Sequence, residues 1–254
     1  MKKQKGHPVF SPVDFRAYLA GRRGIPESEV AVPEDVIFTY DSRIFRAAID
    51  ATAAKRVEWY PYSDRLYTGT PGNKQTGIVL AMIGASAASM NLEELIAYGA
   101  KRIYEVGLSG AIDPTLEPGD VVVLSGALSD EGTSRHYYKV SSRFNPSTPL
   151  TKKLRASLGK MRLRHSFGYA WSIDAAYRET AEKVAHFRRR GARIVNMESS
   201  AIFAVARYRG VEAVSVQIVS DVVSEKRWKP AFHHEVVDKR RGEVLAAVLQ
   251  SIRD

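Results

Sequence analysis

Residues 192–221, ARIVNMESSAIFAVARYRGVEAVSVQIVSD, contain the pattern that decides the fold of this chain. The apolar run 192–196 predicts a strand, 198–210 has the apolar spacing of a helix, and 212–221 predicts a second strand. An acidic residue, Glu198, stands where the first strand turns into the helix. Acids suit the first turn of a helix because they offset the positive end of its dipole. The position alone therefore does not separate a capping role for Glu198 from a functional one.

The same alternation of strands and helices continues through most of the chain. Short runs of β-branched residues indicate strands that are covered on both faces. The other expected strands are 35–40, 65–70, 77–84, 102–108, 119–128 and 164–172. The other expected helices are 42–54, 86–100, 151–160, 178–190 and 233–252. We therefore predict an α/β fold of three layers, α/β/α, in which helices cover both faces of a central mixed sheet.

The length of the chain allows one large domain. With 254 residues, 44% of them hydrophobic, the chain can bury the core of a single α/β unit, which we expect to span 31–254. Residues 1–30 lack sustained periodicity, although 13–21 have the composition of a short helix, and we expect them to form an N-terminal arm that packs against a neighbouring subunit. No apolar run is long enough to span a bilayer and no apolar segment follows the basic start. We therefore expect a cytoplasmic protein with no membrane partner.

Charge and cysteine content exclude several kinds of chemistry. The chain has no cysteine, so disulfides, thiolate nucleophiles and cysteine-ligated metals are excluded, and its six histidines lack the spacing of metal ligands. The net charge is +10, from 38 basic against 28 acidic residues, and this surplus suits a heat-adapted surface. The basic residues are scattered and accompany no recognition helix or RNA-binding signature, so nucleic acid is not an expected partner. A positive field also favours small anionic substrates such as phosphate.

Polar segments follow the expected strands. In a sheet of this kind, ligands gather beyond the carboxyl ends of the strands. The segments at those ends are rich in Gly, Ser and acids, and they are 40–43, 84–86, 107–110, 172–177, 196–198 and 220–221. This composition indicates a site that binds a hydroxylated ligand closely.

Four of the segments, in this order, resemble the nucleoside phosphorylase family in its branch of hexameric purine nucleoside and uridine phosphorylases. They are VGLSGAIDPTLEPGDVVVLSGALSDEGTSRHY (106–137), SIDAAY (172–177), NMESSAIFAVARYRGV (196–211) and VSD (219–221). With GASAASMNLEELIAYGAKRI (84–103), the resemblance covers about residues 35–250. It implies a phosphorylase-like fold and a pentosyltransferase that cleaves a nucleoside with phosphate, giving free base and ribose 1-phosphate. It also implies that phosphate is a co-substrate and that no cofactor is needed.

The resemblance assigns the sugar and the leaving base to particular residues. In the family, the glutamate of the MES motif accepts hydrogen bonds from the ribose 2′ and 3′ hydroxyls and the methionine packs against the sugar, which places these roles on Glu198 and Met197. A carboxylate suits two vicinal hydroxyls because it offers only acceptors. Asp221 matches the aspartate that donates a proton towards purine N7 as electrons flow into the leaving base. The alternative role of Asp221 is an N-cap for a following helix. His136 resembles a residue near the sugar.

The base-binding positions are partly altered. The resemblance places Ser109 and Gly110 beside the base, but the aromatic residue that usually stacks on the base is replaced by Ala176. This change widens the pocket or leaves Tyr177 or Trp171 to contribute stacking, and either ring is equally suited to core packing.

Two positions that follow the segment 172–177 indicate the preferred base. The glutamine and arginine that recognise uracil in uridine phosphorylases fall near Thr180 and Glu182, which cannot make the same contacts. Purine is therefore the expected base. Uridine is the alternative, because 126–138 look more like the uridine-type members.

The phosphate positions depart most from the family pattern. The family arginine that precedes a glycine by two residues is Glu105 here, and the Ser or Thr after that glycine is Leu108. A carboxylate cannot replace a cation in binding a dianion. The Gly-Asp-Pro phosphate loop is altered to YDSR (40–43), in which Arg43 lies close to the position of the family arginine. Arg65 resembles the arginine that a neighbouring subunit lends to the site.

Three hypotheses follow for the activity. In the first, Arg43, Arg65 and the backbone N–H groups around Gly84 and Ser109 hold phosphate, giving a phosphorylase with a rearranged anion site. In the second, the protein is a nucleosidase that uses water, with Glu105 as the base; the alternative role of Glu105 is an ion pair with an arginine such as Arg43. In the third, it is a nucleoside-binding protein or an inactive partner subunit. The borrowed arginine implies a homo-oligomer, a dimer at least and by resemblance a hexamer.

Overall fold

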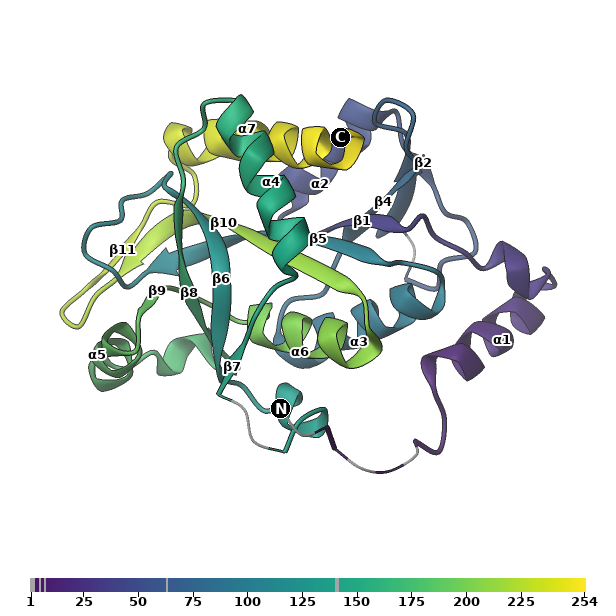
Figure 1. Cartoon of the computed structure of the whole chain (residues 1–254), viewed down its shortest axis with the longest axis horizontal. Coiled ribbons are helices and arrows are strands. Elements are labelled where there is room, and N and C mark those ends of the chain that lie inside the picture. Colours follow the sequence, from purple (N-terminus) through teal and green to yellow (C-terminus); the bar gives the residue numbers. More distant parts are fainter. Residues whose placement is uncertain (1–2, 5, 7, 63, 140–141) are drawn as a thin grey trace.

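The computed structural model describes residues 3–254 except 5, 7, 63 and 140–141. Residues 1–2, 5 and 7 of the expected N-terminal arm therefore lie outside the described residues. The confirmed fold is a three-layer α/β arrangement, with a mixed sheet between two groups of helices (Figure 1).

The sheet contains parallel and antiparallel strands. The strands are β1 Asp35–Thr39, β2 Lys55–Arg56, β3 Leu66–Gly69, β4 Thr76–Leu80, β5 Arg102–Ala111, β6 Val121–Asp130, β7 Arg143–Phe144, β8 Ser166–Ile173, β9 Ala192–Asn196, β10 Glu212–Val223 and β11 Trp228–Pro230. Their order is β11-β10-β6-β8-β9-β5-β1-β4-β3-β2, with β7 on β6 and an additional pairing of β10 with β5. Because of that pairing, strands β10, β6, β8, β9 and β5 form a closed ring. Closure gives the ring strands neighbours on both sides, and in the described residues β11, β7 and β2 each pair with one strand and are the ends of the sheet.

Helices cover both faces of the sheet. The α-helices are α1 Pro12–Arg23, α2 Ser42–Thr52, α3 Ala85–Ala97, α4 Thr148–Lys160, α5 Ala181–Arg189, α6 Ser199–Arg209 and α7 Glu235–Arg253. Helices α2, α4 and α7 pack together on one face, and α3 and α6 pack together on the other (Figure 1). Helix α6 supplies eight buried residues in succession, from Ser199 to Ala206, so it packs against its surroundings on all sides.

Two local features direct side chains towards the carboxyl ends of the strands. Strands β10 and β5 run parallel, and their register shifts by one residue between Val219 and Asp221. A bulge of this kind re-aims the side chains beside it, and here it lies directly before Asp221. The second feature is Gly84, the N-cap of α3, whose φ of 98° favours glycine.

The strands and helices expected from the sequence are confirmed in type and order, with differences at their ends. Strand β4 ends at Leu80 instead of residue 84, because the chain turns at Gly84 into α3. Helix α5 begins at Ala181 instead of residue 178, since Thr180 caps it by accepting a hydrogen bond from the backbone N–H of Lys183. Strands β2, β7 and β11 were not expected, because two or three mostly exposed residues give no periodic signal.

The first thirty residues pack against their own chain where they are described. Helix α1 is capped at Ser11 and lies against α3, and it buries Leu19 and Ala20. Packing of this arm against a neighbouring subunit stays a prediction. No helix in the described part of the chain has the length and apolar content needed to cross a bilayer.

Candidate active site

Glu198 lies at the junction of β9 and α6, with its carboxylate turned away from its own helix. It is the N-cap residue of α6 but makes no side-chain capping hydrogen bond there. Its Oε1 accepts a hydrogen bond from the backbone N–H of Gly84 at 2.8 Å, and its Oε2 accepts one from the N–H of Met197 at 3.0 Å. The two bonds use one acceptor position on each oxygen and leave a second one on each.

The charge state of Glu198 follows from its surroundings. The residue is only 6% exposed. Burial raises the pKa of its carboxyl to about 7, the charge of Glu105 adds to the rise, and the N–H groups of Gly84 and Met197 oppose it. The carboxyl is therefore poised to change its protonation state near neutral pH.

Glu198 faces a cavity of about 290 Å³, which we call the central pocket. It is lined by Tyr40, Asp41, Ile83, Leu108, Asn196, Met197, Glu198 and Phe232. The structure thus brings together Met197 and Glu198, which were expected at the sugar, and Leu108, from the altered phosphate position.

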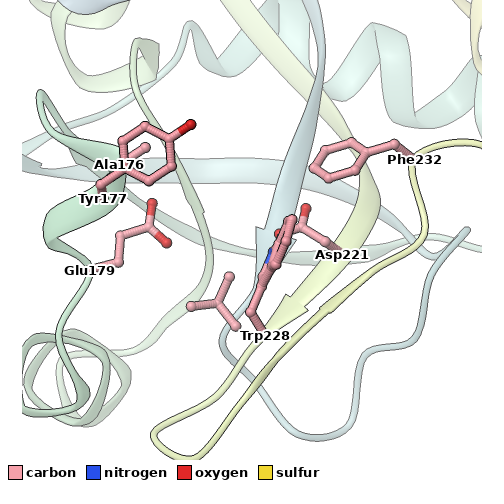
Figure 2. A pocket seen from close by; sticks show the side chains of 7 residues that line it. Ala176, Tyr177, Glu179, Asp221, Trp228 and Phe232 are labelled. Carbon is pink, nitrogen blue, oxygen red and sulfur yellow. The ribbon is translucent and has the colours of Figure 1, made fainter.

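A second cavity, the hairpin pocket, measures about 550 Å³ and lies beside the β10–β11 hairpin (Figure 2). Its lining residues are Ala176, Tyr177, Glu179, Asp221, Val223, Trp228 and Phe232. Phe232 also lines the central pocket, so the two cavities are neighbours. Phe232 therefore forms part of the wall of both cavities.

Asp221 is fixed in the wall of the hairpin pocket by two donors. Its Oδ2 accepts a hydrogen bond from the Trp228 indole N–H at 2.8 Å, and its Oδ1 accepts one from the Ser220 hydroxyl at 2.7 Å. Gly110 makes room for it, because a Cβ at that position would lie 2.8 Å from Val223 Cγ2 and 3.1 Å from Asp221 Oδ2. The alternative role of Asp221 as a helix N-cap is wrong, since the residue lies inside β10.

Glu179 is a pocket residue that the sequence analysis missed. Figure 2 shows it on the wall opposite Asp221. Burial raises the pKa of Glu179 to about 7, and the charge of Asp221 adds to the rise. The available signal was an acid that follows the segment 172–177 by two residues.

A third cavity, the Arg65 pocket, adjoins the central pocket. It measures about 300 Å³ and is lined by Tyr40, Ser42, Arg65, Leu80, Ala81, Met82 and Ile83. Tyr40 and Ile83 line both this cavity and the central pocket. The Arg65 guanidinium donates from Nη1 to the carbonyl oxygen of Leu80 at 3.2 Å, which holds one cation at this wall.

The other expected phosphate residues are placed differently. The Arg43 guanidinium forms an ion pair with Asp238 and contacts His233 Nδ1 at 3.3 Å, and it lines none of the three pockets. The N–H of Gly84 is bonded to Glu198. The structure therefore brings Arg65 to the site and leaves Arg43 outside it.

Glu105 is completely buried, and hydroxyl groups surround its carboxylate. Its Oε1 accepts a hydrogen bond from Tyr40 Oη at 3.1 Å, and its Oε2 accepts one from Ser199 Oγ at 2.7 Å. Burial raises the pKa of Glu105 above its ordinary value, while Ser199, Ser215 and Tyr40 lower it. The alternative of an ion pair with Arg43 is wrong, because Arg43 is paired with Asp238.

Three further expected residues do not line the pockets. The Ser109 hydroxyl donates to Gln217 Oε1 at 2.8 Å inside the core. His136 is exposed at the end of the 3₁₀ helix Thr133–His136. Trp171 is fully buried and stacks on Phe187 at a centroid distance of 4.6 Å, so its role is core packing. Tyr177, in contrast, is fully exposed at the rim of the hairpin pocket.

The described residues contain no group of three histidine or acidic side chains placed to hold a metal ion. The polar side-chain groups that line the three pockets are hydroxyls, carboxylates, the Asn196 amide, the Trp228 indole N–H and the Arg65 guanidinium. Such an arrangement suits acid–base and hydrogen-bonding chemistry on an organic ligand.

Comparison with known proteins identifies relatives of the chain. The family profile described as "Phosphorylase superfamily" matches residues 31–253. A guanosine phosphorylase of Halorubrum lacusprofundi is 31% identical over 167 residues, which are 65% of this chain and 69% of that protein. A uridine phosphorylase of Treponema pallidum is 29% identical over 164 residues, which are 60% of this chain and 64% of that protein, or slightly less than two thirds of its length. A DeoD-type purine nucleoside phosphorylase of Bacillus cereus is 30% identical over 158 residues, 61% of this chain and 67% of that protein.

Solved structures agree with this relationship. A uridine phosphorylase of Vibrio fischeri in complex with 6-hydroxy-1-naphthoic acid superimposes with a TM-score of 0.73 at 26% identity, covering 88% of this chain and 92% of the other. A purine nucleoside phosphorylase of Toxoplasma gondii in complex with immucillin-H gives a TM-score of 0.80 at 18% identity with the same coverage, which shows a common fold. On the match across 31–253, the chain belongs to the phosphorylase superfamily.

Proposed function

We propose that this protein cleaves the N-glycosidic bond of a purine nucleoside and releases the free base. The observation that carries the proposal is Glu198 in the central pocket, where each carboxylate oxygen keeps one acceptor position beside its backbone hydrogen bond. Two acceptors on one carboxylate match the two donors of a ribose 2′,3′ diol. Met197, in the same wall, is the proposed apolar contact of the sugar ring.

The hairpin pocket is the proposed site of the base. It shares Phe232 with the central pocket, so a sugar in one cavity places its base in the other. Bond cleavage leaves electrons on the base, and a positioned acid that supplies a proton promotes it. Asp221 is the proposed donor, and Glu179 on the opposite wall is a second carboxyl from which the base can take a proton.

A purine is the proposed base for reasons of size and chemistry. A cavity of about 550 Å³ lies in the usual range for ligand sites, and Trp228, Phe232 and Tyr177 offer aromatic surface. Glu179 accepts hydrogen bonds, so it suits a base edge that carries N–H groups.

Phosphate is the first candidate for the acceptor of the sugar. The relatives named above are phosphorylases, and Arg65 is a cation in the pocket next to the central one. The proposed product is then ribose 1-phosphate.

Water is the second candidate, and Glu105 favours it. The buried carboxylate of Glu105, which is hydrogen-bonded to Tyr40, disfavours a phosphate dianion nearby and is suited to accept a proton from water.

A homo-oligomer, with a dimer as the smallest active unit and a hexamer as the full assembly, is proposed because a neighbouring copy would bring a second Arg65 to the site. Analytical ultracentrifugation tests that assembly.

A nucleoside panel tests the proposed function. Purine and pyrimidine nucleosides, each with ribose and with 2′-deoxyribose, are incubated with the protein with and without inorganic phosphate, and base release is measured by chromatography. We expect release from purine nucleosides. Binding without turnover for every nucleoside would instead support a binding protein or an inactive partner subunit.

A further inference from the structure

Tyr40 and Glu105 form a pair at the wall between the central pocket and the Arg65 pocket. Tyr40 lines both cavities, and its hydroxyl donates to Glu105 Oε1 at 3.1 Å. Glu105 itself is completely buried. The tyrosine hydroxyl is therefore the link between the cavities and a carboxylate that lies behind them.

The carboxylate of Glu105 is held in place by a hydrogen-bond network. Its Oε2 accepts a hydrogen bond from Ser199 Oγ at 2.7 Å, and Ser199 Oγ accepts one from Asn196 Nδ2 at 2.6 Å. Asn196 lines the central pocket and Ser199 begins α6, directly after Glu198. The network therefore ties the position of Glu105 to the wall that carries Glu198.

The donors described at Glu105 are uncharged. They are the hydroxyls of Tyr40, Ser199 and Ser215. A carboxylate next to an arginine keeps its charge and is a poor proton acceptor, whereas one held by hydroxyls in a buried place gains a proton readily. Glu105 is thus arranged as a proton acceptor that is reached through Tyr40.

We propose that Tyr40 and Glu105 relay a proton from an attacking water molecule, so that water is the acceptor of the sugar. This inference rests on the proposed nucleoside cleavage. The water oxygen bonds to C1′ of the sugar while one of its protons passes to Tyr40 Oη and the tyrosine proton passes to Glu105. The C1′–N bond breaks, its electron pair goes to the base, and Asp221 protonates the base. The products are free base and free ribose, and proton exchange with solvent restores Glu105 and Asp221.

The relay distinguishes water from phosphate on chemical grounds. Hydrogen phosphate is an anion at neutral pH and needs no base to attack, whereas water is a weak nucleophile until a proton is removed. An ionised Glu198 in the wall of the central pocket, with an ionised Glu105 behind Tyr40, also repels a dianion there. Arg65 lines the Arg65 pocket but not the central pocket, and its guanidinium donates to the carbonyl oxygen of Leu80.

The chain contains a matched control for this pair. Tyr62 Oη donates to Glu94 Oε1 at 2.8 Å, and Glu94 is buried like Glu105. Neither residue lines the three pockets. Tyr62→Phe and Glu94→Gln therefore remove the same chemical groups away from the site.

The test compares Tyr40→Phe and Glu105→Gln with the control variants, using purine nucleosides with and without inorganic phosphate. We expect the unchanged protein to release base without phosphate and to form free ribose. Tyr40→Phe and Glu105→Gln are expected to lower kcat by about 10²-fold to 10³-fold, with KM changed less than about threefold, and the control variants to retain kcat within about twofold. Thermal melting establishes that each variant is folded, and Tyr40→Phe provides the measurement if Glu105→Gln does not fold.

A pH profile adds a reading that a purely structural role would not change. The titratable groups next to Glu105 are Tyr40 and Glu198. Because Glu105 must be ionised to accept a proton, kcat of the unchanged protein is expected to rise with pH, and this rise is expected to disappear in Glu105→Gln and to persist in Glu94→Gln.

The outcomes separate the relay from the proposed function. Base release that requires phosphate and yields ribose 1-phosphate, or full kcat in Tyr40→Phe, overturns the relay and leaves nucleoside cleavage standing. No base release from any nucleoside under either condition overturns the proposed function, and the relay with it.

Discussion

Two tyrosine–glutamate pairs with buried glutamates, Tyr40–Glu105 and Tyr62–Glu94, show how the same chemical groups differ by location. In each pair the tyrosine hydroxyl donates to the carboxylate, and burial raises the pKa of the acid. Tyr40 borders two cavities. Tyr62 instead packs its ring edge-on to Tyr60 at a centroid distance of 5.3 Å. Contact with a cavity, more than burial, therefore separates a candidate catalytic pair from a structural one.

The hydrogen-bond partners of Glu105 and Glu94 also distinguish the two pairs. Glu105 has donors at both oxygens, from Tyr40 and Ser199. Glu94 has its described donor at Oε1, and its Oε2 has no hydrogen-bond partner among the described residues. A buried oxygen without a partner costs free energy and supplies no organised route for a proton. The network around Glu105 is organised as expected for a site, and that around Glu94 is not.

The largest expected effect is that of Asp221→Asn, in the wall of the hairpin pocket. The amide cannot protonate the leaving base, so we expect kcat for purine nucleosides to fall by about 10³-fold, while Glu94→Gln retains kcat within about twofold. Steady-state kinetics with a purine and a pyrimidine nucleoside provide the measurement. Equal losses on both substrates would argue against proton donation to a purine nitrogen.

The next largest effect is expected for Glu198→Gln. The neutral side chain loses one acceptor and the charge of the other, so we expect kcat/KM for ribonucleosides to fall by about 10²-fold while thermal melting shows an intact fold. A 2′-deoxynucleoside has one hydroxyl fewer and is expected to lose less. If both sugars lost the same factor, the carboxylate would not be the group that holds the diol.

A smaller effect is expected from pH acting on Glu198. Because burial raises its pKa to about 7, the carboxyl is increasingly protonated below that value and then loses acceptor capacity for the diol. We expect the Kd of a purine nucleoside to increase by about tenfold from pH 8 to pH 6, since each pH unit below the pKa reduces the ionised fraction by up to tenfold. Calorimetric titration measures it. A Kd that is constant over this range, or one that changes equally in Glu198→Gln, would exclude Glu198 as the titrating group.

The sequence predicted most of the strands and helices that carry the site residues, and fewer of the contacts among the residues of the pockets. Strong apolar runs at 192–196 and 212–221 predicted the strands that carry Glu198 and Asp221, because buried strands leave a local signal. The loop around Gly84 was expected to hold phosphate through its backbone. In the structure its N–H instead bonds Glu198, 114 positions away, a contact that local pattern cannot predict.

Other residues of the walls depend on contacts between distant segments. The β10–β11 hairpin brings Trp228 to Asp221, but β11 has too few residues for a periodic pattern. The sequence left Glu105 as a base for water or as the partner of an arginine, and the structure places the hydroxyls of Tyr40, Ser199 and Ser215 at its carboxylate. Charge alone suggested the ion pair, whereas the neighbours of a buried carboxyl are set by contacts between segments that are distant in the sequence.

The smallest expected effect concerns the Tyr62–Glu94 pair, and it is a change in how the stability of Glu94→Gln depends on pH. Burial raises the pKa of Glu94 in the folded state above its ordinary value of 4.5. Its contribution to stability is therefore complete below pH 4.5 and is lost as pH rises through the folded pKa, because ionisation is easier in the unfolded chain. We expect the free energy of unfolding to fall less between pH 5 and pH 8 in Glu94→Gln than in the unchanged protein, as measured by urea denaturation.

Glu198, Glu179 and Glu105 also contribute to the fall of the free energy of unfolding with pH in both proteins, since burial raises their pKa values too. Parallel pH curves would mean that Glu94 does not titrate in this range, and a loss of kcat in this variant would remove the distinction between the two tyrosine–glutamate pairs.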